Sequence, residues 1–497
     1  MTRIVNAPGK HSWAKKAYAV FVLCAATVPL PAQTFTTLYS FDRIDGAYPQ
    51  AALVQGTDGN FYGTTETPGG ANGGGTVFKI TPGGTLTTLY SFCAQGVRCA
   101  DGYNPSGLVQ APNGDFYGTT SEGGASTNCA GCGTFFQMAP SGTLTTIYNF
   151  CPQSGCYDGE GPGGLVRTAN GDFYGTTYGG GTYGYGTIFK ITPGGTLTTL
   201  YSFCSQGGCT DGASPEEGLV EGANGDFYGT TYGGGTYGYG TIFKISPSGA
   251  LTTLYSFCSQ SGCPDGYSPS GLVQAANGYF YGITQEGGAN CVQHTPFGCG
   301  TVFKISPSGA LTTLIRFCSE SGCTNGGLPS ATLVQATDGN LYGTTGDYGG
   351  RGAGGTIFKI TPSGTLTTLY RFCSQVGCPD GQQPVAALVQ GTNGDFYGTA
   401  GRSGAYGYGT VFSLSEGLGP FVELQTTSGR VGATVKILGT NLTGATSVSF
   451  NGTAAAFRVV SSSLIATTVP AGASSGTVEV VTPGGTLLSN VAFRVLP

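Results

Sequence analysis

The chain of 497 residues is poor in charge and has no basic stripe. Only 9% of its residues are Asp, Glu, Lys or Arg, and the net charge of −5 is spread thinly. Nucleic acids and anionic membrane surfaces are therefore poor candidates as partners. Beyond the N-terminal segment, no stretch is long and apolar enough to cross a bilayer, so we expect no transmembrane span in the mature chain. We expect a monomer.

The scarcity of histidine and tryptophan limits the chemistry that the chain can support. Outside the N-terminal segment the one histidine is His294, in the loop "CVQHTPFGC". A catalytic triad would have to use it, and a solvated loop histidine is the simpler interpretation. A histidine-rich metal site is excluded, and we predict no metal, no cofactor and no assigned catalytic residue. The single tryptophan, Trp13, lies near the N-terminus, which weakens the case for sugar binding by stacking.

The N-terminus has the features of a signal peptide. Arg3 and three lysines precede an apolar run at residues 17–30, and Ala32 offers a cleavage point. The apolar run is short for a membrane span, so a cleaved export signal is favoured over an uncleaved anchor. We expect residues 1–32 to be removed and the mature protein to be extracellular or at the cell surface.

Export determines how the 17 cysteines are interpreted. Cys24 leaves with the signal, and the remaining cysteines form local pairs, most of them directly after one repeated phrase. An even number of cysteines in an exported chain predicts disulfides. Zinc would need four ligands together, whereas we expect each pair to stand alone in its own repeat. The predicted disulfides are Cys93–Cys99, Cys129–Cys132, Cys151–Cys156, Cys204–Cys209, Cys258–Cys263, Cys291–Cys299, Cys318–Cys323 and Cys373–Cys378.

Glycine, in contrast, is abundant, with 91 residues, and it punctuates a repeat. The phrase "LVQ…NGxFYGTT" starts at 53, 108, 165, 219, 272, 333 and 388, and "GTxFKI" recurs equally often. Each unit contains four short runs rich in Thr, Val, Ile, Tyr and Phe, with Gly, Pro, Asn or Asp between them, which is typical of strands and turns. Four strands in a unit of this length predict a propeller blade. A β-helix coil would be shorter, and an α-solenoid would need helices.

The phrase "TFTTLYSF" at 34–41 indicates how the ring closes. Similar phrases end six later units, but the seventh unit stops at "GTVFSL" (409–414) without one. The copy at 34–41 has no unit before it and supplies the missing strand. The sequence therefore predicts an all-β protein with a seven-bladed β-propeller at residues 33–417, closed by its N-terminal strand.

The composition changes after residue 417. Short alternating runs such as "TVKILG", "SVSFNG" and "TVEVVTPGG" predict a small immunoglobulin-like (Ig-like) β-sandwich at 418–497. This segment resembles an IPT/TIG domain through "TSGRVGATVKILGTNLTGATSVSFNGTAA" and "VPAGASSGTVEVVTPGG". The repeats resemble the Gloeo-Verruco (GloVer) tandem repeat of bacterial exported proteins, through "DGNFYGTTETPGGANGGGTVFKITPGG" and its sister copies. That resemblance implies an exported repeat protein and brings no established chemistry.

Most carboxylates of the chain recur at fixed turn positions. One set lies in "NGD" or "DGN" hairpins, and a second set precedes glycine in the cysteine loops. Recurrence in every blade indicates geometry, and we interpret both sets as Asx turns, with calcium binding by the second set as an alternative. Three acids break the repeat and are better candidates for ligand binding or catalysis: Glu122, Glu286 and Asp347.

The two faces of the predicted propeller differ in their loops. Because consecutive strands alternate in direction, the short "NGD" and "TPGG" turns share one face, and the cysteine loops and glycine-rich loops share the other. Long aromatic loops on one rim are typical of a binding surface. Tyrosines there could stack on sugars or peptide groups, or fill the space between adjacent blades. The candidate ligand-binding tyrosines are Tyr183, Tyr185, Tyr237, Tyr239, Tyr406 and Tyr408.

These features favour an exported binding or adhesion scaffold that holds a glycan or an extracellular protein on its loop-rich face. The alternatives are a carboxylate-based glycan hydrolase or lyase and a structural component of the envelope. Two non-equivalent acids in the central channel would favour the enzyme, and a cluster of tyrosines would favour binding.

Overall fold

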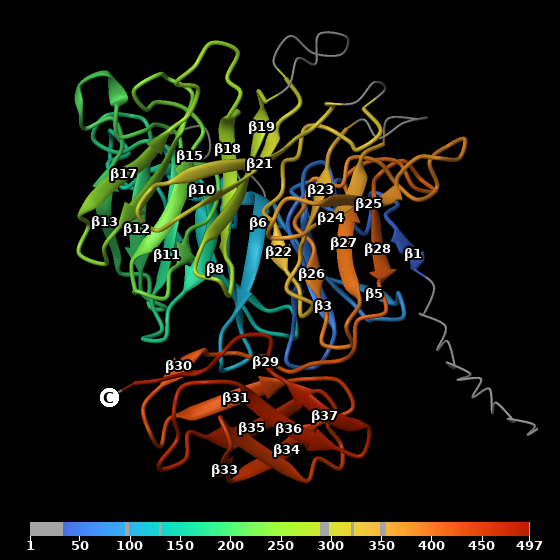
Figure 1. Ribbon diagram of the computed structural model, residues 1–497. Helices are drawn as coiled ribbons and strands as arrows, with labels where there is room; N and C mark the ends of the chain where they lie inside the picture. Colours follow the sequence, from blue (N-terminus) through green and yellow to red (C-terminus); the bar gives the residue numbers. More distant parts are fainter. Residues whose placement is uncertain are drawn as a thin grey trace, which may run out of the picture.

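The protein is a β-propeller with a small β-sandwich below one of its faces (Figure 1). A computed structural model describes residues 33–94, 99–128, 132–288, 298–319, 323–347 and 354–496. Within these residues the propeller contains seven antiparallel sheets of four strands, one for each repeat unit. The predicted all-β fold class is confirmed.

Each blade is a meander whose first strand is the innermost. Six blades take their four strands in chain order, and blade 7 has the order β1-β28-β27-β26. The strands are, in blade 1, β2 (Val54–Gln55), β3 (Phe61–Thr65), β4 (Thr76–Ile80) and β5 (Leu86–Ser91); in blade 2, β6 (Tyr103–Gln110), β7 (Phe116–Glu122), β8 (Thr134–Met138) and β9 (Leu144–Asn149); in blade 3, β10 (Glu160–Arg167), β11 (Phe173–Gly179), β12 (Thr187–Ile191) and β13 (Leu197–Ser202); in blade 4, β14 (Val220–Glu221), β15 (Phe227–Thr231), β16 (Thr241–Ile245) and β17 (Leu251–Ser256); in blade 5, β18 (Tyr267–Gln274), β19 (Phe280–Glu286), β20 (Thr301–Ile305) and β21 (Leu311–Arg316); in blade 6, β22 (Val334–Gln335), β23 (Leu341–Thr345), β24 (Thr356–Ile360) and β25 (Leu366–Arg371); and in blade 7, β26 (Val389–Gln390), β27 (Phe396–Ala400), β28 (Thr410–Ser415) and β1 (Thr34–Ser40). One short 3-10 turn, η1 (Gly207–Cys209), lies in a cysteine loop.

The phrase "FYGTT" forms the buried second strand of the blade and explains how blades pack. Its glycine leaves no room for a side chain, because a Cβ on Gly175 would lie 2.6 Å from the ring of Phe189 on the next strand. Its tyrosine stacks on the phenylalanine of the following blade. Tyr62 and Phe116 have ring centroids 4.2 Å apart, and Tyr174 and Phe227 have the same spacing. Each unit is therefore complete only when its neighbour is in place.

The ring is closed by the N-terminal strand, as predicted. β1 pairs antiparallel with β28, and Thr34 lies opposite Ser415. Tyr397 of blade 7 stacks on Phe61 of blade 1 at 3.9 Å, which repeats the packing of the other blades. The Thr392 amide donates to Gln55 Oε1 at 2.9 Å. Blade 7 is thus joined to blade 1 by the same kinds of contact as blades 1 and 2, where Tyr62 packs on Phe116 and the Thr57 amide donates to Gln110.

The C-terminal segment forms the predicted Ig-like sandwich around a core that includes Ile437, Phe450 and Phe493. Its two main sheets have the orders β29-β31-β35-β34 and β33-β32-β36-β37, and β30 pairs with β38. The strands are β29 (Glu423–Leu424), β30 (Ser428–Gly429), β31 (Thr434–Leu438), β32 (Ser447–Phe450), β33 (Thr453–Ala455), β34 (Phe457–Ser461), β35 (Leu464–Thr468), β36 (Val478–Thr482), β37 (Gly485–Leu488) and β38 (Arg494–Val495).

The sandwich contacts the propeller at its face of short turns (Figure 1). Ser463 Oγ donates to the Thr57 carbonyl of blade 1 at 2.9 Å, and Arg494 Nη1 donates to the Ala223 carbonyl of blade 4, also at 2.9 Å. Blades 1 and 4 are three blades apart in the ring, so the sandwich spans this end of the axis. The loop-rich face carries no such cover from the sandwich.

The local disulfides follow the predicted pattern. Six of them lie in the described residues: Cys93–Cys99, Cys151–Cys156, Cys204–Cys209, Cys258–Cys263, Cys318–Cys323 and Cys373–Cys378. Cys132 and Cys299 are also disulfide-bonded, while their predicted partners Cys129 and Cys291, like His294 and residues 1–32, lie outside the described residues.

Candidate functional site

The aspartates of the cysteine loops hold these loops against the outermost strands. Asp158 Oδ2 accepts a hydrogen bond from the Tyr148 hydroxyl at 2.9 Å and another from the Cys151 amide at 3.0 Å. The interpretation of this set as Asx turns is wrong, because the donors precede the aspartate by three to eleven residues, whereas an Asx turn takes the amide two residues after it. The same tyrosine–aspartate tether joins Tyr39–Asp45, Tyr90–Asp101, Tyr201–Asp211, Tyr255–Asp265 and Tyr370–Asp380.

Two of the hairpin aspartates, Asp58 and Asp338, do form Asx turns. The Asn60 amide donates to Asp58 Oδ1 at 3.1 Å, and the Asn340 amide donates to Asp338 Oδ1 at 3.0 Å. Where the order is "NGD", asparagine takes the accepting role, as Asn113 does for the Asp115 amide. These side chains hold the turns that face the sandwich.

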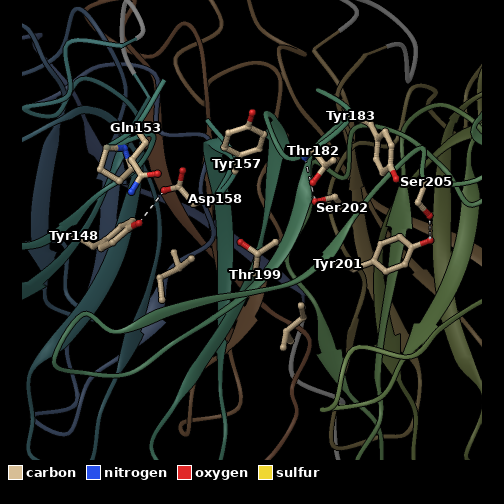
Figure 2. Close-up of a pocket in the computed structure, with 13 residues that line it drawn as sticks. Tyr148, Gln153, Tyr157, Asp158, Thr182, Tyr183, Thr199, Tyr201, Ser202 and Ser205 are labelled. Carbon is tan, nitrogen blue, oxygen red and sulfur yellow. Dashed lines mark hydrogen bonds between the residues drawn. The ribbon is translucent and has the colours of Figure 1, made fainter. Parts of the chain in front are cut away.

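A groove of about 670 Å³ lies between the outer strands of blades 2 and 3, and the tether forms one wall of it (Figure 2). The cysteine loop contributes Tyr157 and Asp158, and the glycine-rich loop of blade 3 contributes Tyr183. Tyr157 and Tyr183 are 60% and 49% exposed. The groove is also lined by Tyr148, Pro152, Gln153, Thr182, Leu197, Thr199, Leu200, Tyr201, Ser202 and Ser205.

The hydroxyls of Tyr148 and Tyr201 are held as neutral donors. Burial, followed by the charge of Asp158, raises the pKa of Tyr148 well above its usual range. Burial also raises the pKa of Tyr201 to about 12, and its hydroxyl contacts Asp211 at 2.7 Å. The groove therefore presents phenols, hydroxyls and one carboxylate acceptor.

The two tyrosines of each "TYGYG" phrase have different positions. The first, at Tyr183, Tyr237 and Tyr406, is 49%, 48% and 64% exposed. The second faces the following blade. The ring of Tyr239 lies 5.3 Å from that of Tyr267, and the half-buried Tyr408 lies 6.2 Å from Tyr48. At the equivalent Tyr185 the backbone carbonyl accepts the Ser214 amide of the next blade at 2.8 Å, and the side chain is 47% exposed. The space-filling interpretation therefore suits Tyr239 and Tyr408 better than the first tyrosines.

The three acids that break the repeat lie in different blades. Glu122 and Glu286 end β7 and β19 at equivalent positions, and each accepts a hydrogen bond from a tyrosine directly across the ladder, Tyr103 or Tyr267. Asp347 of blade 6 forms a backbone bridge with Gly327. Glu122 and Glu286 thus have tyrosine partners, and the role of all three acids in binding stays a prediction.

Sequence reasoning missed three acids that line the central channel. A cavity of about 440 Å³ on the axis is lined by residues of six blades, among them Glu66, Glu216 and Glu217. For Glu216 and Glu217, the sequence did contain a signal, in the phrase that leads into the first strand of each unit. The proline there is followed by small or neutral residues, as in "NPSGLVQ" and "GPGGLVR", whereas blade 4 has "SPEEGLV".

The channel carboxylates hold protons more tightly than free acids do. Burial, followed by the charge of Glu217, raises the pKa of Glu216 to about 7. Burial raises the pKa of Glu217 as well, although Ser270 Oγ donates to it at 2.9 Å and favours the anion. Burial and the nearby Glu122 raise the pKa of Glu66. No Lys or Arg of the described residues lines this cavity, so the channel can accept and donate protons near neutral pH.

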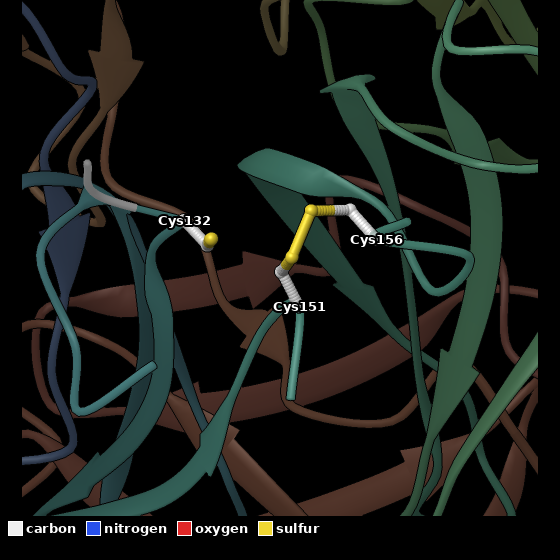
Figure 3. A group of neighbouring side chains, drawn as sticks. All are labelled: Cys132, Cys151 and Cys156. Carbon is white, nitrogen blue, oxygen red and sulfur yellow. A yellow bond between two sulfur atoms is a disulfide. The ribbon is translucent and has the colours of Figure 1, made fainter. Parts of the chain in front are cut away.

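The cysteine pairs are less isolated than we expected. The Sγ atoms of Cys132, Cys151 and Cys156 all lie within 4.8 Å of one another, and Figure 3 shows Cys132 beside the Cys151–Cys156 bond. Cys299, Cys318 and Cys323 form the same arrangement in blade 5. The expectation that each pair stands alone in its repeat is wrong, because the loop between the second and third strands and the loop after the fourth strand meet on the same face.

Seven four-stranded blades, with the N-terminal strand completing the last, define the chain as a β-propeller with an appended Ig-like domain. The profile of the Gloeobacter/Verrucomicrobia repeat matches residues 27–130, 93–292 and 261–457. Because these matches span most of the chain, the protein belongs to this repeat family, as the resemblance implied. The IPT/TIG domain matches residues 421–495. No curated protein matches the chain in sequence.

Solved structures with a similar fold are distant. The extracellular domain of a protein described as a hybrid two component system from B. thetaiotaomicron is 10% identical, with a TM-score of 0.48, and the match covers 82% of this chain and 45% of that one. The PQQ-bound aldose sugar dehydrogenase of Streptomyces coelicolor is 13% identical, with a TM-score of 0.39, and the match covers 63% of this chain and 94% of that one. The chain thus spans less than half of the first protein. These matches carry no argument about function.

Proposed function

We propose that the protein is an exported glycan-binding protein whose ligand lies in the groove between blades 2 and 3. The disulfide-rich all-β fold fits an exported protein. In the described part of the chain, no helix is long and apolar enough to span a membrane. The observation that carries the proposal is the clustering of four tyrosines around one concave surface of about 670 Å³; they come from the outer strands of blades 2 and 3, the cysteine loop between them and the glycine-rich loop of blade 3.

The chemistry of the groove suits a sugar. A pyranose has one apolar face and a rim of hydroxyls, so it needs an aromatic surface together with donors and acceptors. The exposed rings of Tyr157 and Tyr183 supply the first. The carboxylate of Asp158 and the hydroxyls of Thr199 and Ser202 supply the second. A groove of this volume accommodates one or a few sugar units.

The test is retention on a panel of immobilised neutral polysaccharides, with released reducing ends recorded in parallel. The protein to use is residues 33–497, with the double variant Y157A/Y183A. Y406A is the matched control, because it removes an exposed tyrosine at the loop position of blade 7 that corresponds to Tyr183. We expect the double variant to weaken binding about tenfold, which corresponds to about 1.4 kcal/mol. Equal retention of all three proteins, or no retention of the wild type, would refute the groove as a glycan site.

A second candidate, a glycan-active enzyme, is favoured by the channel acids. Glu216, with its pKa raised to about 7, could serve as a proton donor beside the ionisable Glu217. Release of reducing ends by the wild type, and its loss in both E216Q and E217Q, would favour this function over simple binding. Release that persists in both variants would point to a contaminant or to other residues.

A further inference from the structure

The groove between blades 2 and 3 has a counterpart of about 640 Å³ between blades 5 and 6. Both are formed by two neighbouring outer strands and the cysteine loop that joins their blades. At the tether position, Ile315 stands where blade 2 has Tyr148, and Asn325 stands where its loop has Asp158. At the end of the second wall, Arg371 replaces Ser202.

These replacements reverse the charge of the groove. The tyrosine–aspartate hydrogen bond of blade 2 has no equivalent between Ile315 and Asn325. Only the backbone bond of the tether remains, in which the Cys318 amide donates to Asn325 Oδ1 at 3.2 Å. The carboxylate has been exchanged for a neutral amide, and Arg371 places a guanidinium beside the loop that joins blades 5 and 6. Arg316 also lines the groove, but the Pro264 carbonyl of the loop between blades 4 and 5 holds its guanidinium. Serine or asparagine occupies the Arg371 position in blades 1 to 4, so this arginine departs from the repeat.

Backbone carbonyls, and not carboxylates, hold the two guanidiniums. Arg316 Nε donates to the Pro264 carbonyl at 2.7 Å. Arg371 donates to the Thr324 carbonyl through Nε at 3.3 Å and Nη2 at 3.1 Å. These bonds orient the side chains without neutralising them, and no ion pair to either arginine occurs among the described residues. Glu320 of the same loop lies outside those residues.

We propose that the groove between blades 5 and 6 binds a carboxylate or sulfate group carried by an acidic polysaccharide. Each guanidinium is exposed and keeps N–H groups beyond those bonded to carbonyls, so it can donate to two oxygens of one anion. Thr324, Asn325 and Thr368 add neutral donors and acceptors for the sugar around the anion. This site is separate from the tyrosine groove and does not depend on the function proposed there.

The experiment measures the Kd of residues 33–497 for a glucuronate-containing oligosaccharide, for a neutral glucose oligosaccharide of the same length, and for inorganic sulfate. The variant is R316S/R371S, because serine occupies this strand position in blades 3 and 4 (Ser202 and Ser256) and the repeat tolerates it. Y157A/Y183A is the control for the other groove. Melting temperatures of all variants establish that they are folded.

The wild type should prefer the uronate oligosaccharide, and R316S/R371S should weaken that binding by about 10- to 100-fold, the range expected for charge-assisted hydrogen bonds. Wild-type binding should also weaken as salt increases, and Y157A/Y183A should leave it unchanged. Sulfate that binds as tightly as the oligosaccharide would support the anion site and identify a free oxyanion as its ligand. Equal affinity of the wild type for the two oligosaccharides would overturn the proposal. Full affinity of a folded R316S/R371S variant, or wild-type binding that does not depend on salt, would overturn it as well.

Discussion

Deletion of residues 33–41 should destabilise the propeller strongly, because this segment closes the ring. Phe41 is fully buried and its ring lies 5.2 Å from that of Phe78 in blade 1. Phe35 is half-buried and stacks on Tyr370 at 3.7 Å. Removing one buried phenylalanine costs about 3–5 kcal/mol, and losing the stacked ring adds about 1 kcal/mol. At roughly 2 °C for each kcal/mol in a large domain, the melting temperature should fall by about 10 °C.

The assay is differential scanning calorimetry of the truncated and full mature proteins. F203A is the matched control, since Phe203 occupies the same repeat position in blade 3 and is equally buried, but its strand belongs to a blade that is continuous in sequence. A synthetic peptide of residues 33–42 should raise the melting temperature of the truncated protein and leave that of F203A unchanged. An unchanged melting temperature after truncation, or a peptide without effect, would refute closure by β1.

Two further predictions concern the tether and the channel. In blade 5, I315Y combined with N325D should rebuild the tyrosine–aspartate hydrogen bond, so a double-mutant cycle in urea should give a favourable coupling of about 1 kcal/mol; additive single effects would contradict the tether. In the channel, burial raises the pKa of Glu216 to about 7 from an ordinary value of 4.5. The folded chain therefore binds more protons than the unfolded chain between these values, and stability should fall as pH rises from 4.5 to 7 and then level off. E216Q removes this contribution, so its stability should exceed that of the wild type most clearly above pH 7; parallel profiles would show that the channel does not perturb the carboxyl.

The fold could be predicted from the sequence because its determinants are local and repeated. The strand runs, the turn residues and the paired cysteines of a unit lie within about one period, and the same pattern recurs in every copy. The missing fourth strand of blade 7 could be found by counting phrases. The six described local disulfides followed from the same spacing.

Which residues share a surface was decided by the tertiary structure. Tyr148 and Tyr183 line one groove because adjacent blades place an outer strand near the next glycine-rich loop. Likewise, Cys132 approaches Cys151 because the loops before β8 and after β9 lie on the same face. The sequence separation of these residues does not predict that they are neighbours. The repeat makes the blades easy to recognise, but it does not show which of the equivalent residues share a surface.

The channel shows the same limit most clearly. Glu66 and Glu216 are far apart in the sequence, and they line one cavity because the innermost strand of every blade faces a single axis. The sequence by itself determined the number of blades, their closure and the sandwich, since these depend on patterns within a unit. Only the closed ring decided which departures from the repeat face each other, because that depends on the geometry between units.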